Sequence, residues 1–179
     1  MKVVFRTDAS HQIGSGHVMR SLTLADALKE QGCDCTFVSR LHPGNLNELI
    51  RQRGYGVHEL SARPQEASRK NQSAPELAHG AWLGADWASD AEETKAAIGE
   101  RGADWLIVDH YALDEQWETS LRPHCAKIMV IDDLADRKHD CDLLLDQNLV
   151  ADMEQRYEGK LPANCGRMLG PEYALLKPE

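Results

Sequence analysis

The sequence predicts an α/β domain in which a parallel sheet is covered by helices on both faces. Apolar, β-branched runs alternate with segments of helical periodicity along the chain, and this alternation is typical of βαβ units. One of the runs, ADWLIVDH at 103–110, is apolar almost throughout, as expected for a parallel strand that is buried on both faces. With 179 residues the chain has the length of a single domain, spanning 1–179.

The first half of the chain begins with a strand at 2–8 and a glycine-bearing loop. A helix starts at His17, where Val18, Leu22, Ala25 and Leu28 recur at helical spacing, and Gly32 ends it. Two further strands at 35–40 and 55–60 flank a short helix at 45–53. The polar stretch 61–80 is expected to be a surface excursion.

Helices and strands alternate in the second half as well, beginning with a helix from about Ala85 to Arg101 that ends at Gly102. The remaining expected elements are a strand at 103–110, a helix at 114–122, a strand at 126–133 and strand ends at 142–148 and 167–170. We find no internal repeat or interdomain linker. The pattern predicts a Rossmann-like parallel sheet.

Polar side chains gather where the expected strands end. They are Asp8, Asp109, His110, Asp132, Asp133, Asp146, Gln147 and Asn148. Each alone fits a turn or a helix N-cap equally well. Four such strand ends together predict a polar ligand crevice, because ligands of open α/β sheets bind at the carboxyl edge.

A glycine loop lies between the first strand and the first helix. Gly14, Ser15 and Gly16 permit a tight turn and a close backbone approach, and the helix start favours a bound anion such as a diphosphate. A dinucleotide fingerprint would need Gly at Met19, and the Lys-Ser/Thr pair of a P-loop is missing. We therefore expect neither NAD nor any other cofactor.

His17 is the strongest candidate for a catalytic residue. The positive end of the helix favours a neutral imidazole, which suits a general base, although position alone also leaves open a capping or phosphate-binding role. Arg20 follows one turn later. It is expected to hold a phosphate, to pair with a strand-end aspartate, or to be a solvated surface residue.

Composition narrows the class of protein. A net charge of −9 disfavours nucleic-acid binding, and no apolar run approaches a membrane span. The N-terminus lacks the features of a signal peptide, so a cytoplasmic location is expected. The five cysteines have no zinc-ligand spacing, so we expect reduced thiols and no metal.

Three segments carry a resemblance to a known family. FRTDASHQIGSGHVMRSLTLADAL, IVDHYALD and IDDLADRKHDCDLLLDQN, in this order, resemble the hydrolases that remove UDP from UDP-2,4-diacetamido-2,4,6-trideoxy-β-L-altropyranose in pseudaminic acid biosynthesis. The similarity extends from Lys2 to the LGPEYALLKPE tail. It implies the N-terminal half of a GT-B-type fold, which consists of two Rossmann-like domains around a cleft.

The resemblance also implies a reaction. Water attacks the anomeric carbon and releases UDP and the free sugar with inversion. His17 is implied to activate the water, Gly14 and Gly16 to shape the loop near the diphosphate, and Asp109, His110 and Tyr111 to line the sugar side. The partner is then a UDP-sugar, and we expect a monomer in the full-length enzyme.

Two features depart from the family pattern. The chain ends at Glu179, where the nucleotide-binding C-terminal domain would begin, so we expect this half to lack it. In the tail, Lys177 stands where an arginine is expected to contact substrate, and lysine keeps the charge without the bidentate fork.

The chemistry agrees with one base, because UDP is already a good leaving group and two carboxylates are not required. Asp132 and Asp133 are neighbours on a strand and point to opposite faces, so one of them is expected to be a ligand or a structural hydrogen-bonder. Two other functions stay open, a GT-B glycosyltransferase and a non-catalytic sugar-binding domain.

Overall fold

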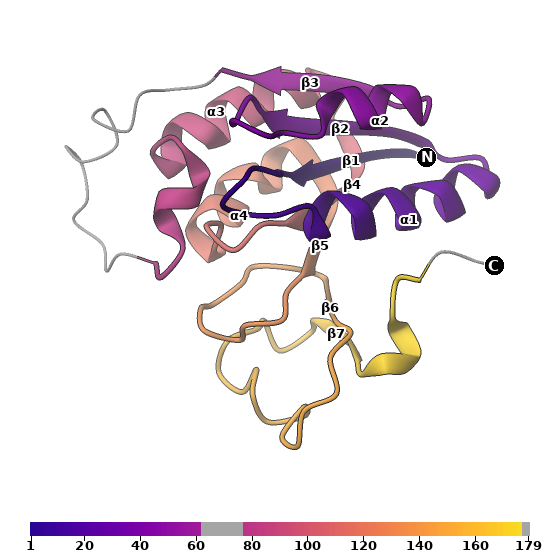
Figure 1. Ribbon diagram of the computed structural model, residues 1–179. Coiled ribbons are helices and arrows are strands. Elements are labelled where there is room, and N and C mark those ends of the chain that lie inside the picture. Colours follow the sequence, from indigo (N-terminus) through magenta and orange to yellow (C-terminus); the bar gives the residue numbers. More distant parts are fainter. Residues whose placement is uncertain (62–76, 177–179) are drawn as a thin grey trace.

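The computed structural model describes residues 1–61 and 77–176 and contains one sheet of seven parallel strands (Figure 1). The spatial order is β3-β2-β1-β4-β5-β6-β7. The strands are β1 (Lys2–Thr7), β2 (Asp34–Arg40), β3 (Gly56–Leu60), β4 (Ala103–Asp109), β5 (Cys125–Ile131), β6 (Leu143–Asp146) and β7 (Gly166–Leu169). The predicted fold class, a Rossmann-like parallel sheet, is confirmed.

The chain reverses its direction of winding beside β1, which pairs with β2 on one side and β4 on the other. Thr7 and Asp109, the last residues of β1 and β4, are register partners. Asp8 and Asp132 directly follow β1 and β5, so the expected strand-end carboxylates do share one edge. A reversal of this kind opens a crevice at the carboxyl ends of the strands.

Helices cover both faces because successive strand side chains point to opposite sides. On one face Val3 and Phe5 of β1 pack with Val18 and Leu22 of α1 (Gly16–Glu30) and with residues of α2 (Asn47–Gln52). On the other face lie α3 (Trp87–Ile98) and α4 (Glu115–Leu121), whose buried members include Ile98 and Trp117. Figure 1 shows the two helix layers on either side of the sheet.

The third helix is shorter than the expected range 85–101. Asp86 caps α3 by accepting a hydrogen bond from the backbone N–H of Ser89 at 2.9 Å, and Gly99, with φ +76°, ends it. Just before it, η2 (Gly80–Leu83) forms a 3₁₀ turn. Most of the expected surface excursion, at 62–76, lies outside the described residues.

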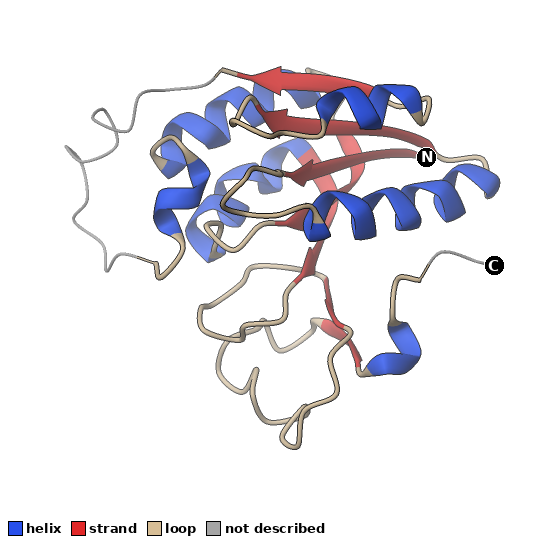
Figure 2. Ribbon diagram, viewed as in Figure 1, coloured by secondary structure: helices blue, strands red, loops and turns tan. Residues whose placement is uncertain are grey.

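The segments after β5 and β6 consist of loops and turns rather than α-helices within the described ranges (Figure 2). Two short 3₁₀ turns, η3 (Arg122–His124) and η4 (Pro171–Tyr173), accompany β5 and β7. None of the described helices is both long and apolar enough to cross a membrane. In the same residues no three His, Cys, Asp or Glu side chains are grouped so that they could hold a metal ion, and all five cysteines are free thiols.

Candidate active site

His17 lies in the first turn of α1, with its imidazole against the carboxyl end of β4. The residue is 6% exposed. Its Nδ1 lies 2.6 Å from Oδ1 of Asp109, the last residue of β4, which is itself buried. The structure therefore brings the expected base into direct contact with one of the expected site carboxylates.

The Asp109 carboxylate determines which nitrogen of His17 carries a proton. Burial opposes the negative charge of Asp109, but His17 and the hydrogen bonds from Arg20 outweigh it and hold the pKa of this carboxyl below its ordinary value. An ionised carboxylate only accepts hydrogen bonds, so Nδ1 is the donor of the 2.6 Å contact. Nothing in residues 1–61 and 77–176 hydrogen-bonds Nε2, which in a neutral ring is an acceptor.

Arg20, one turn further along α1, joins Asp109 to a second carboxylate. Its Nε and Nη2 donate to Asp109 Oδ2 and Oδ1 at 2.6 and 2.7 Å, and its Nη1 donates to Asp133 Oδ2 at 2.9 Å. The side chain is only 11% exposed. Of the roles that the sequence left open, pairing with strand-end aspartates is the one that the geometry supports, and it locks Asp109 in place beside His17.

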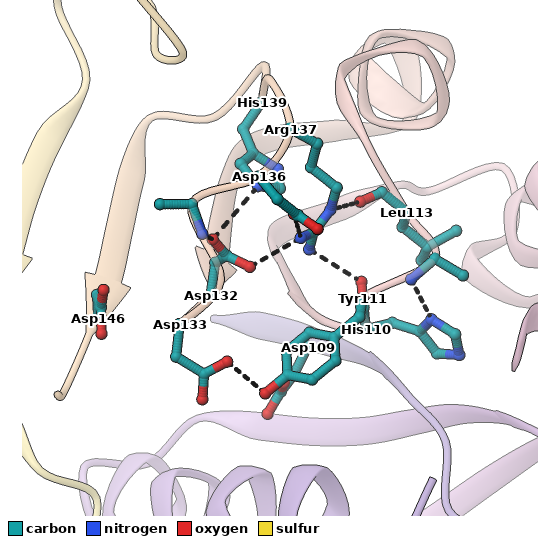
Figure 3. A network of polar contacts seen from close by, with 12 residues as sticks. Asp109, His110, Tyr111, Leu113, Asp132, Asp133, Asp136, Arg137, His139 and Asp146 are labelled. Carbon is teal, nitrogen blue, oxygen red and sulfur yellow. Dashed lines mark hydrogen bonds and ion pairs between the residues drawn. The ribbon is translucent and has the colours of Figure 1, made fainter. Parts of the chain in front are cut away.

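Tyr111 completes this network from the loop after β4. Its hydroxyl donates to Asp133, and its ring centroid lies 4.4 Å from that of His17, edge to face. Burial and the neighbouring Asp133 raise the pKa of Tyr111, so the phenol stays protonated. Figure 3 shows Asp133 turned toward Tyr111 and Asp109.

Asp132, which was expected at the site, points the other way (Figure 3). It is fully buried and accepts hydrogen bonds from Arg137 Nη1 at 2.9 Å and from the Tyr157 hydroxyl at 3.0 Å. Burial opposes its charge, but Arg137 keeps the pKa of Asp132 below the ordinary value. Of the two adjacent aspartates, Asp132 is thus the structural hydrogen-bonder, and Asp133 is the one that faces His17 through Tyr111 and Arg20.

Asp8 and His110 lie beneath the site rather than on its surface. Asp8 is fully buried and bonded to Arg6 Nη1 at 2.6 Å, and its Oδ2 lies 3.1 Å from His110 Nε2. His110 is 3% exposed, and its Nδ1 accepts a hydrogen bond from the backbone N–H of Ala112 at 3.0 Å. These expected site residues therefore support the ends of β1 and β4 and do not line an open surface.

The glycine loop faces open space. Gly14 has φ +81°, a conformation that glycine adopts without strain, and a Cβ added at Gly14 or Gly16 would meet no atom within 4 Å. Ser15 is the N-cap residue of α1, but its side chain makes no capping hydrogen bond. Beside the loop is a hollow of about 280 Å³, and the residues that line it are Gly16, Met19, Arg20, Thr23, Arg53, Gln147 and Leu175.

The structure thus groups His17, Arg20, Asp109 and Tyr111, and it adds Asp133. The alternation of side chains along a strand predicts that Asp132 and Asp133 point to opposite faces, but it does not say which of them faces His17. The spacing of His17 and Arg20, three residues apart on one helix face, was a usable signal for a shared partner. Lys177 lies outside the described residues.

Comparisons with known proteins bear on both sequence and fold. No protein-family model matches the chain. MurG of Acinetobacter baumannii is similar in structure, with a TM-score of 0.54 and 12% sequence identity, over 94% of this chain and 44% of that one. At this identity the likeness concerns the fold alone, and the matched part is a Rossmann-like domain that covers less than half of that chain.

A sequence relative is more informative. It is the UDP-2,4-diacetamido-2,4,6-trideoxy-β-L-altropyranose hydrolase of Campylobacter jejuni, which is 33% identical over 180 residues, covering 100% of this chain. The chain spans about half, 53%, of the length of that relative. The resemblance that the sequence motifs carry is therefore confirmed: along its entire length, this chain is similar in sequence to a UDP-diacetamido-trideoxy-altropyranose hydrolase.

Proposed function

We propose that this chain is the sugar-side, base-bearing half of a hydrolase that acts on a UDP-linked 2,4-diacetamido-2,4,6-trideoxy sugar. The observation that carries the proposal is the 2.6 Å contact between His17 Nδ1 and Asp109 Oδ1 at the start of α1. This contact leaves Nε2 as the basic atom, at the sheet edge where α/β proteins bind their ligands. The substrate class comes from the activity for which the Campylobacter relative is named.

The proposed step is a single displacement at the anomeric carbon. A bond forms between the water oxygen and this carbon, while the bond from the carbon to the terminal phosphate oxygen of UDP breaks. His17 Nε2 takes the proton from water, and the electron pair of the broken bond leaves with UDP. Because UDP leaves readily, one base is sufficient, and attack from the opposite face inverts the anomeric configuration.

The Asp109, Arg20 and Asp133 network acts through His17 in this proposal. Asp109 holds the ring with Nδ1–H toward the carboxylate, and it stabilises the imidazolium that forms when Nε2 accepts the proton. Arg20 holds both oxygens of Asp109 at 2.6 and 2.7 Å, so the carboxylate cannot rotate away. Arg20 and Asp109 are therefore positioning residues.

We further propose that the nucleotide is held mainly by a second domain, because the chain spans 53% of its hydrolase relative. The glycine loop at Gly14, Ser15 and Gly16 would then meet the diphosphate, since backbone N–H groups at a helix start are unpaired. In this proposal the full-length enzyme is a cytoplasmic monomer without a cofactor and serves pseudaminic acid biosynthesis.

The test is UDP release by the two-domain protein, comparing His17→Asn with the parent. If His17 is the base, kcat falls by roughly 10²–10⁴-fold. The matched control is His124→Asn, because His124 lies in η3 at the amino end of the strands, on the opposite edge of the sheet. This control keeps kcat near the parent value.

Two outcomes would contradict the proposal. A His17→Asn protein that turns over within a few-fold of the parent, with a stability loss of about 1 kcal/mol, would reduce His17 to a structural hydrogen-bond partner of Asp109. Product analysis tests the alternative that the protein transfers the sugar to an acceptor instead of to water. A sugar found on an acceptor hydroxyl instead of free in solution would identify a glycosyltransferase.

A further inference from the structure

Beside the base lies a cluster of aromatic rings that the proposed reaction does not use. We name it the aromatic wall, and it consists of Tyr111, His79 and Trp82. The His79 and Trp82 centroids are 4.3 Å apart, and they lie 5.5 and 5.9 Å from the Tyr111 centroid. Because Tyr111 also touches His17 at 4.4 Å, the wall extends from the base outward along the carboxyl edge of the sheet.

The wall is held by packing on the sheet. Leu83, next to Trp82 in η2, is buried in the core. Gly84 has φ +68°, and a Cβ there would lie 2.6 Å from the His42 ring, so the backbone after η2 lies close against the end of β2. On the other side, the hydroxyl of Tyr111 is bonded to Asp133. These contacts anchor Tyr111 and the backbone around η2 beside the site.

The wall differs in chemistry from the charged network that holds His17. Arg20, Asp109 and Asp133 present charges, whereas the rings of Tyr111 and Trp82 present apolar faces and edges to a neighbouring group. Trp82 and His79 are only partly buried, unlike the core residue Leu83. A ligand whose anomeric carbon is at His17 therefore lies next to partly exposed aromatic rings, while the paired charges of Arg20 and Asp109 stay largely buried.

We propose that the aromatic wall receives the apolar substituents of the sugar, and that Trp82 determines specificity for a sugar with acetamido and methyl groups in place of hydroxyls. This inference rests on the proposed function. The substrate of the Campylobacter relative has two acetamido groups and is a 2,4,6-trideoxy sugar. Its methyl groups gain by burial against aromatic rings, whereas an ordinary hexose would bury hydroxyls there without hydrogen-bond partners.

The test uses the two-domain protein and two substrates, the UDP-linked 2,4-diacetamido-2,4,6-trideoxy sugar and UDP-N-acetylglucosamine. For Trp82→Ala we expect KM for the first substrate to rise about 10-fold, because even one missing methylene contact in an apolar pocket is worth roughly 10–200-fold in discrimination. The value of kcat stays within about threefold, since His17 and its partners are untouched. The preference for the first substrate over the second falls by a similar factor, and Trp82→Phe restores most of it.

The matched control is Trp87→Ala. Trp87 begins α3 and is 38% exposed, so its loss removes an indole of the same size from outside the wall. Its KM and substrate preference stay at the parent values. If Trp82→Ala, with an unchanged Tm, also keeps the parent KM and preference, the aromatic wall has no part in sugar recognition.

A binding measurement separates this inference from the proposed reaction. The diacetamido substrate is titrated by calorimetry into the His17→Asn protein, with and without Trp82→Ala. A Kd about 10-fold weaker with Trp82→Ala supports the wall even if the parent releases no UDP, a result that would overturn only the hydrolase proposal. Equal Kd values in the two proteins overturn the wall even if the parent is an active hydrolase.

Discussion

Asp109→Asn is the substitution that tests the site geometry most directly. Asparagine keeps the size of the side chain but removes the charge that Arg20 and His17 contact at 2.6–2.7 Å. Its amide also offers a donor where the carboxylate only accepted. Only one oxygen remains as an acceptor, so Arg20 loses one of its two hydrogen bonds to position 109 and keeps its 2.9 Å hydrogen bond to Asp133.

The expected loss of stability in Asp109→Asn follows from the burial of this side chain. Removing one partner of a buried ion pair costs about 3–5 kcal/mol, and we expect the lower end because asparagine fills the same space. A domain of this size loses about 2–4 °C in Tm per kcal/mol, so Tm falls by roughly 6–12 °C. Loss of the aspartate that holds a catalytic imidazole in one tautomer costs about 10⁴-fold in kcat in serine proteases, and we expect a comparable loss here.

The control for this experiment is Asp90→Asn. Asp90 is also fully buried and bonded to arginines, with Arg6 Nη2 at 2.6 Å and Arg40 Nη2 at 2.7 Å, but it does not contact His17. Thermal unfolding is recorded for both variants, and kcat for UDP release is measured at a temperature below both unfolding transitions. We expect similar stability losses and a large kcat loss for Asp109→Asn only. Equal kcat losses in both proteins, or a nearly normal kcat for Asp109→Asn, would refute the tautomer argument.

Three further predictions concern pH, thiols and ligand affinity. Burial lowers the pKa of His110, whose Nδ1 accepts a hydrogen bond from the backbone N–H of Ala112, so the folded protein loses stability as pH falls below about 6.5. Between pH 7 and 5 the Tm of His110→Asn should therefore fall less than the Tm of the parent. Parallel curves of Tm against pH for the two proteins would contradict this. The Cys141 and Cys165 sulfurs are 3.6 Å apart, so a low-molecular-weight disulfide should oxidise them to an internal disulfide; mass spectrometry that finds both thiols free would contradict this. Residues 1–179 alone should bind UDP at about millimolar Kd, roughly −4 kcal/mol, and micromolar binding by calorimetry would refute the two-domain proposal.

Much of the sheet could be predicted because its strands have a strong local signal. The run at 103–110 became β4, and the glycine loop and His17 fell at the start of α1 as expected. The predicted end of α3, at Arg101, lies three residues beyond the observed end at Ile98. Gly99 and Gly102 both adopt positive φ, and only the tertiary packing decides which of them ends the helix.

The partners of the site residues could not be predicted in the same way. The sequence suggested a substrate role for His110, yet its ring lies beneath the surface next to Asp8, since neighbouring residues at a strand end point in different directions. The helix-end argument for His17 could not include Asp109, which is 92 residues away in the chain. Contacts of this range depend on the strand order, and the sequence pattern carries no information about it.

The strand order also bears on how the chain folds during synthesis. β2 and β3 add to one side of β1, and β4 to β7 add in turn to its other side, so no strand of this sheet must insert between two already paired strands. The one non-consecutive pairing, β1 with β4, joins Lys2 to Asp104 across 102 residues, and closing so long a loop is entropically costly. We therefore expect substitutions at the β1–β4 contact to slow folding, whereas substitutions in β6 and β7, which pair last, mainly speed unfolding.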